Sequence, residues 1–527
     1  MLIPALTLLV PLPPLPPGPQ ETAVLMRAGD LVDGREVAYS GGATIDDDGH
    51  WWTRVQAELA GGELVSYLLR DGTAWLRSGQ RITAPFALVS NPGEPVGGSA
   101  NRALVVILDD IQPPLTVSGP HAAVLRNERA LLILGELMGV TGLPATARCG
   151  RIDAIAANTH DTVVVNLLVS SAPTLVRFRF APDGSELARE RLLAAGDDLG
   201  GGRIAESFTR VAIDERGDWL VRVTTSAGGT YMVGPAGVVL GSGDATPVAG
   251  RLIESVLRYH DGDEFGGVAS ALRLDGDPAS DQILLVNGAL LAQEGELIPS
   301  LSPLVPPVPL AEIGPLRRTR SGVVYWLAVT QAGVLGEGSL LRDKTPFLQT
   351  GVSSVAGETV TSFYPAANSF EISPDGRFWL GRVFLASSDE AYVRVDFGTS
   401  EPRPGCTPQA GSLRHTDGLV LAGATIGLEL DAPAPLGAQA RVHLSTLGPR
   451  VFSDCGVATP FGERLVDPAG RLGVLLAGAY TGAPLAATVP IPASSALVDL
   501  EFFAQGSFLA PGSVQLTNGL RFEIGAP

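Results

Sequence analysis

The chain has 527 residues, of which 45% are hydrophobic, so it is long and apolar enough for two or three domains with large cores. It carries 37 basic and 55 acidic residues, and no basic stripe is visible, which excludes a typical nucleic-acid-binding protein. Its 64 glycines and 41 prolines, with only 6% aromatic residues, favour an all-β structure.

Residues 1–20 read MLIPALTLLVPLPPLPPGPQ, an apolar run followed by a proline-rich tail. The run is too short and too interrupted by proline to span a bilayer. It resembles the hydrophobic part of a secretion signal, although a basic start and a clear cleavage site are missing. We predict a signal peptide and a secreted or cell-surface protein, with a misplaced start codon or a disordered tail as the alternatives. No other segment is predicted to cross a membrane.

Residues 21–398 contain a repeated pattern, and its clearest copy is 213–243. Asp214 and Gly217 belong to a turn signal, because aspartate caps free backbone groups and glycine accepts positive φ. Trp219, Val221 and Val223 then alternate with other residues at the period of two that is typical of a strand. Two further glycine-containing turns and two short apolar runs follow. The pattern predicts a small antiparallel meander that needs neighbouring copies to bury both faces.

Markers of the same turn recur along the chain with spacings of roughly 50–60 residues, close to the length of a propeller blade. They are Gly49, Asn101, Asn158, Gly217, Gly266, Gly322 and Gly376. The last copy lacks its final strand, and the segment from Thr22 reads as such a strand. We therefore predict a β-propeller of seven blades, closed by the N-terminal strand, with six or eight blades as the alternatives.

Residues 399–405 have the composition of a linker, and the repeat ends there. Alternating apolar residues in 406–527 predict a small antiparallel β-sandwich. Asn518-Gly519 is the strongest short hairpin signal in the chain. Cys406 and Cys455 are disulfide candidates for a secreted protein, and Cys149 is a lone cysteine that we interpret as incidental.

The turns of the D-x-x-G-x-W kind, such as Asp214 to Trp219, and the hairpins such as LLRDG from Leu68 carry a resemblance. They resemble uncharacterised secreted repeat proteins of bacteria with large envelope proteomes, notably planctomycete-like ones. The tail resembles a C-terminal β-sandwich of such proteins, through Cys406 with 411–413, the segment from Ile491 and LTNGLRFEIG from Leu516. The resemblance implies location and fold, and it supplies no catalytic residues.

Two acidic loops form the main candidate metal site, ahead of the acidic runs 46–48 and 109–110. Oxygen ligands at alternating positions suit Ca²⁺, and the candidate ligands are Asp261, Asp263, Asp275 and Asp277. Solvated acidic loops are the alternative, because the EF-hand spacing is absent. The tryptophans at recurring strand positions predict a core between blades first and a carbohydrate-stacking surface second. These residues are Trp51, Trp52, Trp219, Trp326 and Trp379.

These observations favour a non-enzymatic, monomeric binding or scaffold protein that presents propeller loops to a glycan or protein partner. No catalytic motif or cofactor fingerprint is present in the sequence, and we predict no cofactor apart from the calcium candidate. The alternative is a propeller hydrolase or lyase acting on a polysaccharide. Such an enzyme gathers carboxylates from different blades on its axis and leaves no local motif. A lactonase-like propeller with an axial metal is a third, weaker alternative.

Overall fold

The structure is a computed structural model in which β-strands supply nearly all the regular structure of the described residues. It describes residues 22–524 except 59–61, 84–85, 99–100, 113–120, 128, 264–265, 303, 321, 331–336, 365–368, 388, 398, 404–410, 418–419, 421–422, 447–456, 495–496 and 498–499. The helical element named within these residues is a 3-10 turn, η1 (Pro468–Gly470). No helix in this part of the chain has the length and apolar character needed to cross a lipid bilayer.

The chain divides into two compact units. The N-terminal unit comprises residues 22–300 and 307–396, and the C-terminal unit comprises residues 301–306 and 397–524. The predicted signal peptide in residues 1–20 lies outside the described residues.

The described residues of the N-terminal unit form seven antiparallel sheets of four or more strands. Sheet 1 contains β2 (Leu31–Val32), β3 (Arg35–Ile45), β4 (Trp51–Glu58), β5 (Leu64–Arg70) and β6 (Thr73–Arg77). Sheet 2 contains β7 (Arg81–Thr83), β8 (Phe86–Val96), β9 (Ala103–Gln112), β10 (His121–Arg126) and β11 (Arg129–Ile133). Sheet 3 contains β12 (Cys149–Ala157), β13 (Thr162–Val169), β14 (Ala172–Phe180) and β15 (Glu186–Ala194).

The remaining four sheets follow the same chain order. Sheet 4 contains β16 (Ala205–Ile213), β17 (Trp219–Thr225), β18 (Thr230–Gly234) and β19 (Gly237–Gly241). Sheet 5 contains β20 (Ile253–Gly262), β21 (Val268–Leu274), β22 (Gln282–Val286) and β23 (Ala289–Gln293), and a short pair follows it, β24 (Leu297–Ile298) with β25 (Val308–Pro309). Sheet 6 contains β26 (Glu312–Arg318), β27 (Val324–Val329), β28 (Gly338–Arg342) and β29 (Thr345–Gln349). Sheet 7 contains β30 (Ser354–Val355), β31 (Glu358–Phe363), β32 (Phe370–Ile372), β33 (Phe378–Leu385), β34 (Glu390–Asp396) and β1 (Thr22–Arg27).

The N-terminal strand β1 completes the last sheet. It pairs antiparallel with β34, so that Thr22 lies opposite Val395 and Arg27 lies opposite Ala391. The sequence predicted this pairing, because the last repeat lacks its own final strand. The pairing covers the edge of β34 that would otherwise present unpaired backbone groups.

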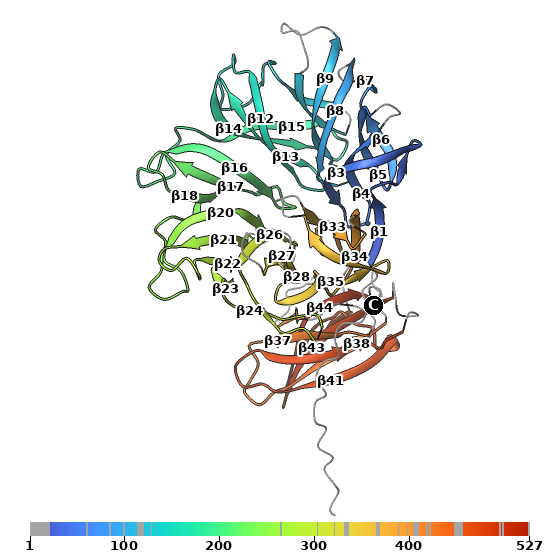
Figure 1. Cartoon of the computed structure of the whole chain (residues 1–527). Helices are drawn as coiled ribbons and strands as arrows, with labels where there is room; N and C mark the ends of the chain where they lie inside the picture. The colour runs from blue at the N-terminus through green and yellow to red at the C-terminus, as the bar shows by residue number, and fades with distance from the viewer. Residues whose placement is uncertain are drawn as a thin grey trace, which may run out of the picture. The chain divides into compact units, whose positions relative to one another are not determined.

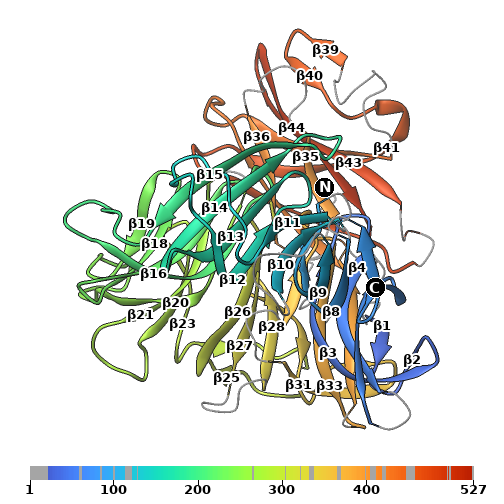
Figure 2. The ribbon, with the colours of Figure 1, turned by 90° about the horizontal axis from the view of Figure 1, so that it is seen from above.

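The sheets follow one another side by side, and the order closes on itself (Figures 1 and 2). In each sheet, the strand that comes directly before the turn marker contacts the equivalent strand of the next sheet. The contacting pairs are β3 with β8, β8 with β12, β12 with β16, β16 with β20, β20 with β26, β26 with β32, and β32 with β3. These seven strands therefore form a closed ring, and we call them the inner strands.

The core of the N-terminal unit lies between neighbouring sheets. One cluster joins Trp52 and Leu68 of sheet 1 to Val106 and Leu125 of sheet 2. The five tryptophans singled out in the sequence are all buried, with exposed fractions between 0% and 6%. Their prediction as core residues is confirmed, and they offer no exposed stacking surface.

The C-terminal unit consists of two larger sheets and one hairpin within its described residues. The five-stranded sheet contains β35 (Thr399–Arg403), β44 (Ser513–Glu523), β43 (Glu501–Ala510), β38 (Gln439–Ser445) and β41 (Arg471–Ala479). The three-stranded sheet contains β36 (Ser412–Asp417), β37 (Thr425–Asp431) and β42 (Leu485–Pro490), and the hairpin contains β39 (Val457–Thr459) and β40 (Gly462–Arg464). Leu428 of the three-stranded sheet and Val442, Phe508 and Phe522 of the five-stranded sheet share one hydrophobic core.

Two local predictions for this unit are wrong. The expected linker begins with a strand, because Thr399–Arg403 forms β35 and pairs with β44. Proline is tolerated there, since β35 lies at the edge of its sheet. The expected hairpin at Asn518-Gly519 is absent, because both residues lie within β44. The Asn518 side chain instead accepts a hydrogen bond from the Leu413 backbone N–H at 2.6 Å and donates one to its carbonyl at 3.0 Å.

Candidate functional site

The turns between the inner strands and the strands that follow them share one hydrogen-bond pattern. The side-chain oxygen of the first turn residue accepts a backbone N–H from four or five residues later, at 2.7–3.0 Å, and the two backbones also bond. The residues that act in this way are Asp46, Asn158, Asp214, Asp263, Thr319 and Ser373. Small oxygen-bearing side chains favour such turns. At these positions the oxygen-bearing side chains therefore have a structural role.

Neighbouring turns are also bonded to one another. The Asn101 side chain donates to Oδ1 of Asn158 at 3.1 Å, and the Asn158 side chain donates to the Glu215 carbonyl at 3.2 Å. The Asp375 backbone N–H donates to Oδ1 of Asp47 at 2.8 Å, which links the turn of sheet 7 to the turn of sheet 1. These bonds hold adjacent sheets together at the turn end of the ring.

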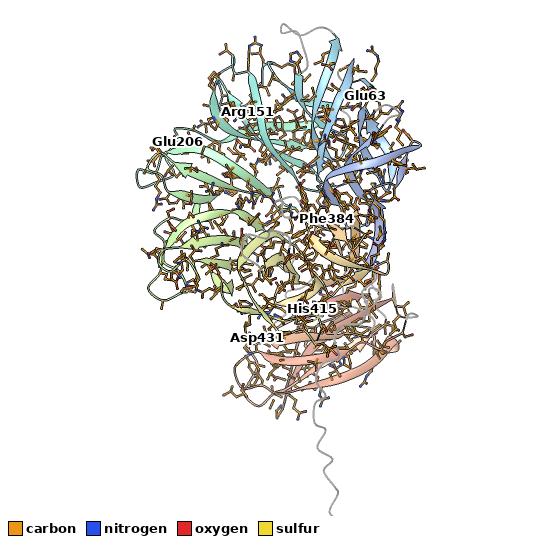
Figure 3. The ribbon with its side chains drawn as sticks, viewed as in Figure 1. Glu63, Arg151, Glu206, Phe384, His415 and Asp431 are labelled. Carbon is orange, nitrogen blue, oxygen red and sulfur yellow. The ribbon has the colours of Figure 1, made fainter. Side chains whose placement is uncertain are left out.

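The inner strands enclose a cavity of about 450 Å³ in the N-terminal unit. Its lining comes from all seven inner strands, so no single segment of the sequence contains it. Six lining residues stand two positions before the first residue of a turn, which places them at one level of the ring. They are Thr44, Ala156, Ala212, Asp261, Arg317 and Glu371. Figure 3 shows exposed Arg151 and Glu206 near the starts of β12 and β16, at the other ends of two inner strands.

Arg317 and Glu371 form the central ion pair of this cavity. The Arg317 Nε donates to Glu371 Oε2 at 2.6 Å, and a second guanidinium nitrogen donates to the other carboxylate oxygen. A third bond runs from Arg317 to its own neighbour, the Leu316 carbonyl, at 2.9 Å. A planar guanidinium fits a carboxylate in this two-bonded manner. The pair therefore holds a fixed orientation on the cavity wall.

Asp261 lies beside this pair, and burial raises the pKa of its carboxyl group. Arg317 and the backbone N–H of Arg318 oppose that increase, and the N–H donates to Asp261 Oδ2 at 2.9 Å. The backbone N–H of Gly262 donates to Oδ1 at 3.0 Å. Both carboxylate oxygens are thus oriented by hydrogen bonds to the backbone.

Arg210 reaches the same group of charges from β16. Its φ is 44°, and the pairing of β16 with β17 shifts register between Thr209 and Val211. Positive φ is uncommon for a residue with a Cβ atom, so the backbone is strained here. Burial, and after it the nearby positive charge of Arg317, lowers the pKa of Arg210 to about 10. The cavity therefore brings two guanidinium groups close together.

Two further titratable groups border these charges. Burial lowers the pKa of His260 to about 3, so its imidazole is neutral at physiological pH. Burial raises the pKa of Glu215, while hydrogen bonds from Thr159 oppose the increase. The Thr159 hydroxyl donates to Glu215 Oε2 at 2.5 Å, and its backbone N–H donates to the same oxygen at 3.0 Å.

The structure separates the four predicted calcium ligands. Asp261 lies near the end of β20 and Asp263 begins the turn before β21, whereas Asp275 and Asp277 lie beyond the other end of β21. A seven-residue strand spans about 23 Å, which is far more than one calcium site allows. Asp263 instead forms an ion pair with Arg318 at 2.6 Å. Among the described residues, no group of three or more acidic, histidine or cysteine side chains is arranged to hold a metal.

Cys406 and Cys455, the predicted disulfide candidates, lie outside the described residues. Cys149 is a buried free thiol at the start of β12, and burial raises its pKa to about 12. A thiol with such a pKa is not a nucleophile at neutral pH, which agrees with its interpretation as incidental.

Sequence reasoning missed Arg210, Arg317 and Glu371. Each belongs to a different inner strand, and no spacing in the sequence connects them. The available signal is their distance from the turns, because Arg317 and Glu371 each stand two residues before a turn residue. Strand alternation then directs them to the same side as the cavity-lining Asp261.

No family model matches the sequence, and no curated protein matches it either. A solved structure of "KlHsv2 with loop 6CD replaced by a Gly-Ser linker" has 8% identity and a TM-score of 0.29, covering 68% of this chain and 98% of that one. A complex of BBS1N with ARL6DN has 11% identity and a TM-score of 0.22, covering 60% and 94%. Native E. coli alpha-2-macroglobulin has 10% identity and a TM-score of 0.15, covering 97% and 39%. At these TM-scores the similarities identify neither a family nor an activity.

Proposed function

We propose that this chain is a secreted or cell-surface binding protein of a bacterial envelope, with no enzymatic activity, that engages a glycan or protein partner. In this proposal the N-terminal unit is a seven-bladed β-propeller closed by β1, and the C-terminal unit is an accessory β-sandwich. The resemblance to secreted planctomycete-like repeat proteins, carried by the turn and hairpin motifs, supports the location. We also propose that the protein acts as a monomer.

The observation that carries the binding function is the cavity of about 450 Å³ inside the ring of inner strands. Small-molecule sites occupy roughly 300–1,000 Å³ and present a few oriented polar groups. Here the ion pair between Arg317 and Glu371 and the backbone bonds to Asp261 fix such groups in place. Oriented polar groups of this kind can fix the orientation of a bound ligand.

A polysaccharide hydrolase or lyase is the second candidate, because Asp261 and Glu215 both line the cavity and burial raises the pKa of both. A raised carboxyl pKa is what a general acid requires at neutral pH. The binding proposal ranks first because interactions inside the protein oppose both increases. Arg317 and backbone N–H groups lower the pKa of Asp261, and hydrogen bonds from Thr159 lower that of Glu215.

The experiment is a pull-down with the full chain against envelope fractions and secreted polysaccharides of the source cell. Mass spectrometry would identify both the retained material and any released fragments. Retention of a glycan or protein without fragments supports the binding function. Release of sugar fragments by the wild-type protein, and its loss in Asp261→Asn, would replace that function with the hydrolase or lyase.

A further inference from the structure

The cavity has two chemically different walls. Sheets 5, 6 and 7 contribute Asp261, Arg317 and Glu371 at one level. Strand β12 of sheet 3 contributes Ala154 and Ala156, whose side chains are small and apolar, whereas sheet 4 contributes Ala212 together with the charged Arg210. The cavity therefore offers charged hydrogen-bonding groups on most of its lining and an apolar surface at β12.

The charges in this cavity disfavour an anionic ligand. The guanidinium groups of Arg210 and Arg317 are balanced by the carboxylates of Asp261 and Glu371. Arg318 and Arg320 are balanced by their ion-pair partners Asp263 and Asp47, at 2.6 and 2.5 Å. The other charged lining residues are all acidic, namely Glu94, Asp214 and Glu215. The whole chain also carries a formal net charge of −18. A carboxylate or phosphate ligand would meet net repulsion from these groups.

A sugar ring matches both walls. Its hydroxyl groups donate to carboxylates such as Asp261 and Glu371 and accept from guanidinium groups such as that of Arg317. One face of the ring carries C–H groups, which pack against alanine side chains. Because a sugar is neutral, its hydroxyls can bond the paired charged groups and leave the charge balance of the cavity unchanged.

We propose that the cavity binds the end of a neutral oligosaccharide, with its hydroxyls on Asp261, Arg317 and Glu371 and its C–H face on Ala154 and Ala156. This inference rests on the proposed binding function and names the ligand class. The backbone of Arg210 supports it, because strained residues cluster at ligand sites, and the strain at φ 44° accompanies a guanidinium placed among these charges.

The test is isothermal titration of the full chain with short oligosaccharides of glucose, mannose and galactose. Oligosaccharides of galacturonate and of glucosamine provide acidic and amine-bearing comparisons of similar length. Ala154→Phe fills the cavity from its apolar wall and leaves every ion pair intact. We expect it to weaken binding at least about tenfold, which corresponds to ~1.4 kcal/mol. Ala279→Phe is the matched control, because Ala279 is exposed in the loop between β21 and β22. This variant should bind as the wild type does.

A second variant, Glu371→Gln, keeps the side-chain size and removes the charge, and we expect it to weaken binding as well. Thermal unfolding of each variant shows whether it is folded. If Ala154→Phe is misfolded, the binding measured for Glu371→Gln tests the inference. Tighter binding of galacturonate or glucosamine chains than of neutral ones would overturn the inference. So would neutral binding that neither variant weakens. If the wild type binds none of these oligosaccharides and the pull-down retains a protein partner, the inference fails and the proposed function stands.

Discussion

The contact between Asp47 and Asp375 gives the sharpest prediction, because it joins the first and last sheets of the ring. The Asp375 backbone N–H donates to Asp47 at 2.8 Å, and Arg320 forms an ion pair with Asp47 at 2.5 Å. Burial and the negative charge of Asp47 raise the pKa of Asp375 to about 7. Asp375→Asn removes this titration and keeps an oxygen for the bonds from Ser373 and Arg377.

The sign and size of the effect follow from linkage. The pKa of Asp375 is higher in the folded state than its ordinary value of 3.8, so the folded protein binds more protons between those two pH values. Stability is therefore fully present below about pH 4 and is lost as the pH rises through 7. A shift of about three units corresponds to an upper bound of ~4 kcal/mol, and partial exposure of Asp375 reduces it to about 1–3 kcal/mol. We expect Asp375→Asn to recover all of that stability at pH 8 and less than half of it at pH 5, because the loss grows steadily between pH 4 and pH 7.

Urea unfolding at pH 5 and pH 8 measures the difference. Asp183→Asn is the control, because Asp183 also accepts a backbone N–H in a turn and hydrogen bonds with Ser185 lower its pKa. A lowered carboxyl pKa affects stability only as the pH falls below the ordinary pKa of that carboxyl group. The effect of Asp183→Asn on stability should therefore be equal at pH 5 and pH 8. An Asp375→Asn variant with equal effects at the two pH values would refute the reasoning.

Three further predictions concern packing and pairing. Glu371→Ala should cost about 3 kcal/mol in denaturant unfolding because it leaves Arg317 buried without its carboxylate, whereas joint replacement of the pair by Leu and Met should cost less. Deletion of residues 22–27 should expose the edge of β34 and produce dimers or aggregates in size-exclusion chromatography, while the full chain stays monomeric. Asn518→Ala should lower the free energy of unfolding by about 1–3 kcal/mol, because the backbone N–H and C=O of Leu413 lose their partner, and Asn518→Asp should restore only the bond to the N–H.

Much of the fold could be predicted because local turn chemistry and strand alternation agree along residues 213–243. Residues 214–217 form the turn after β16, and Trp219–Thr225, Thr230–Gly234 and Gly237–Gly241 form the expected meander. All seven turn markers lie between an inner strand and the strand that follows it. The N-terminal strand was also predictable, since a sheet lacking its last strand leaves backbone groups unpaired.

The wrong local predictions have a common physical cause. Asn518-Gly519 has the residues of a tight turn, but the side chain of Asn518 is bonded to Leu413, which lies 105 positions earlier. The reversal occurs instead at Pro511-Gly512, where Gly512 has φ 77°. Likewise, the prolines of 399–405 suggest a linker until β44 supplies a partner for Thr399–Arg403. Short segments of this kind take their structure from distant strands, which local composition does not report.

The first turn residue and the residue two positions before it have different roles. This difference explains why the cavity could not be predicted and how its residues can be found. The first turn residue is restricted to small oxygen-bearing side chains, because its oxygen must accept a backbone N–H. The residue two positions earlier faces the cavity and has no such role, so it varies from Ala156 to Arg317. Substitutions there change the cavity lining and leave the turn bonds in place. In this chain the turn residues therefore carry the folding signal, and the residues two positions before them set the chemistry of the cavity lining.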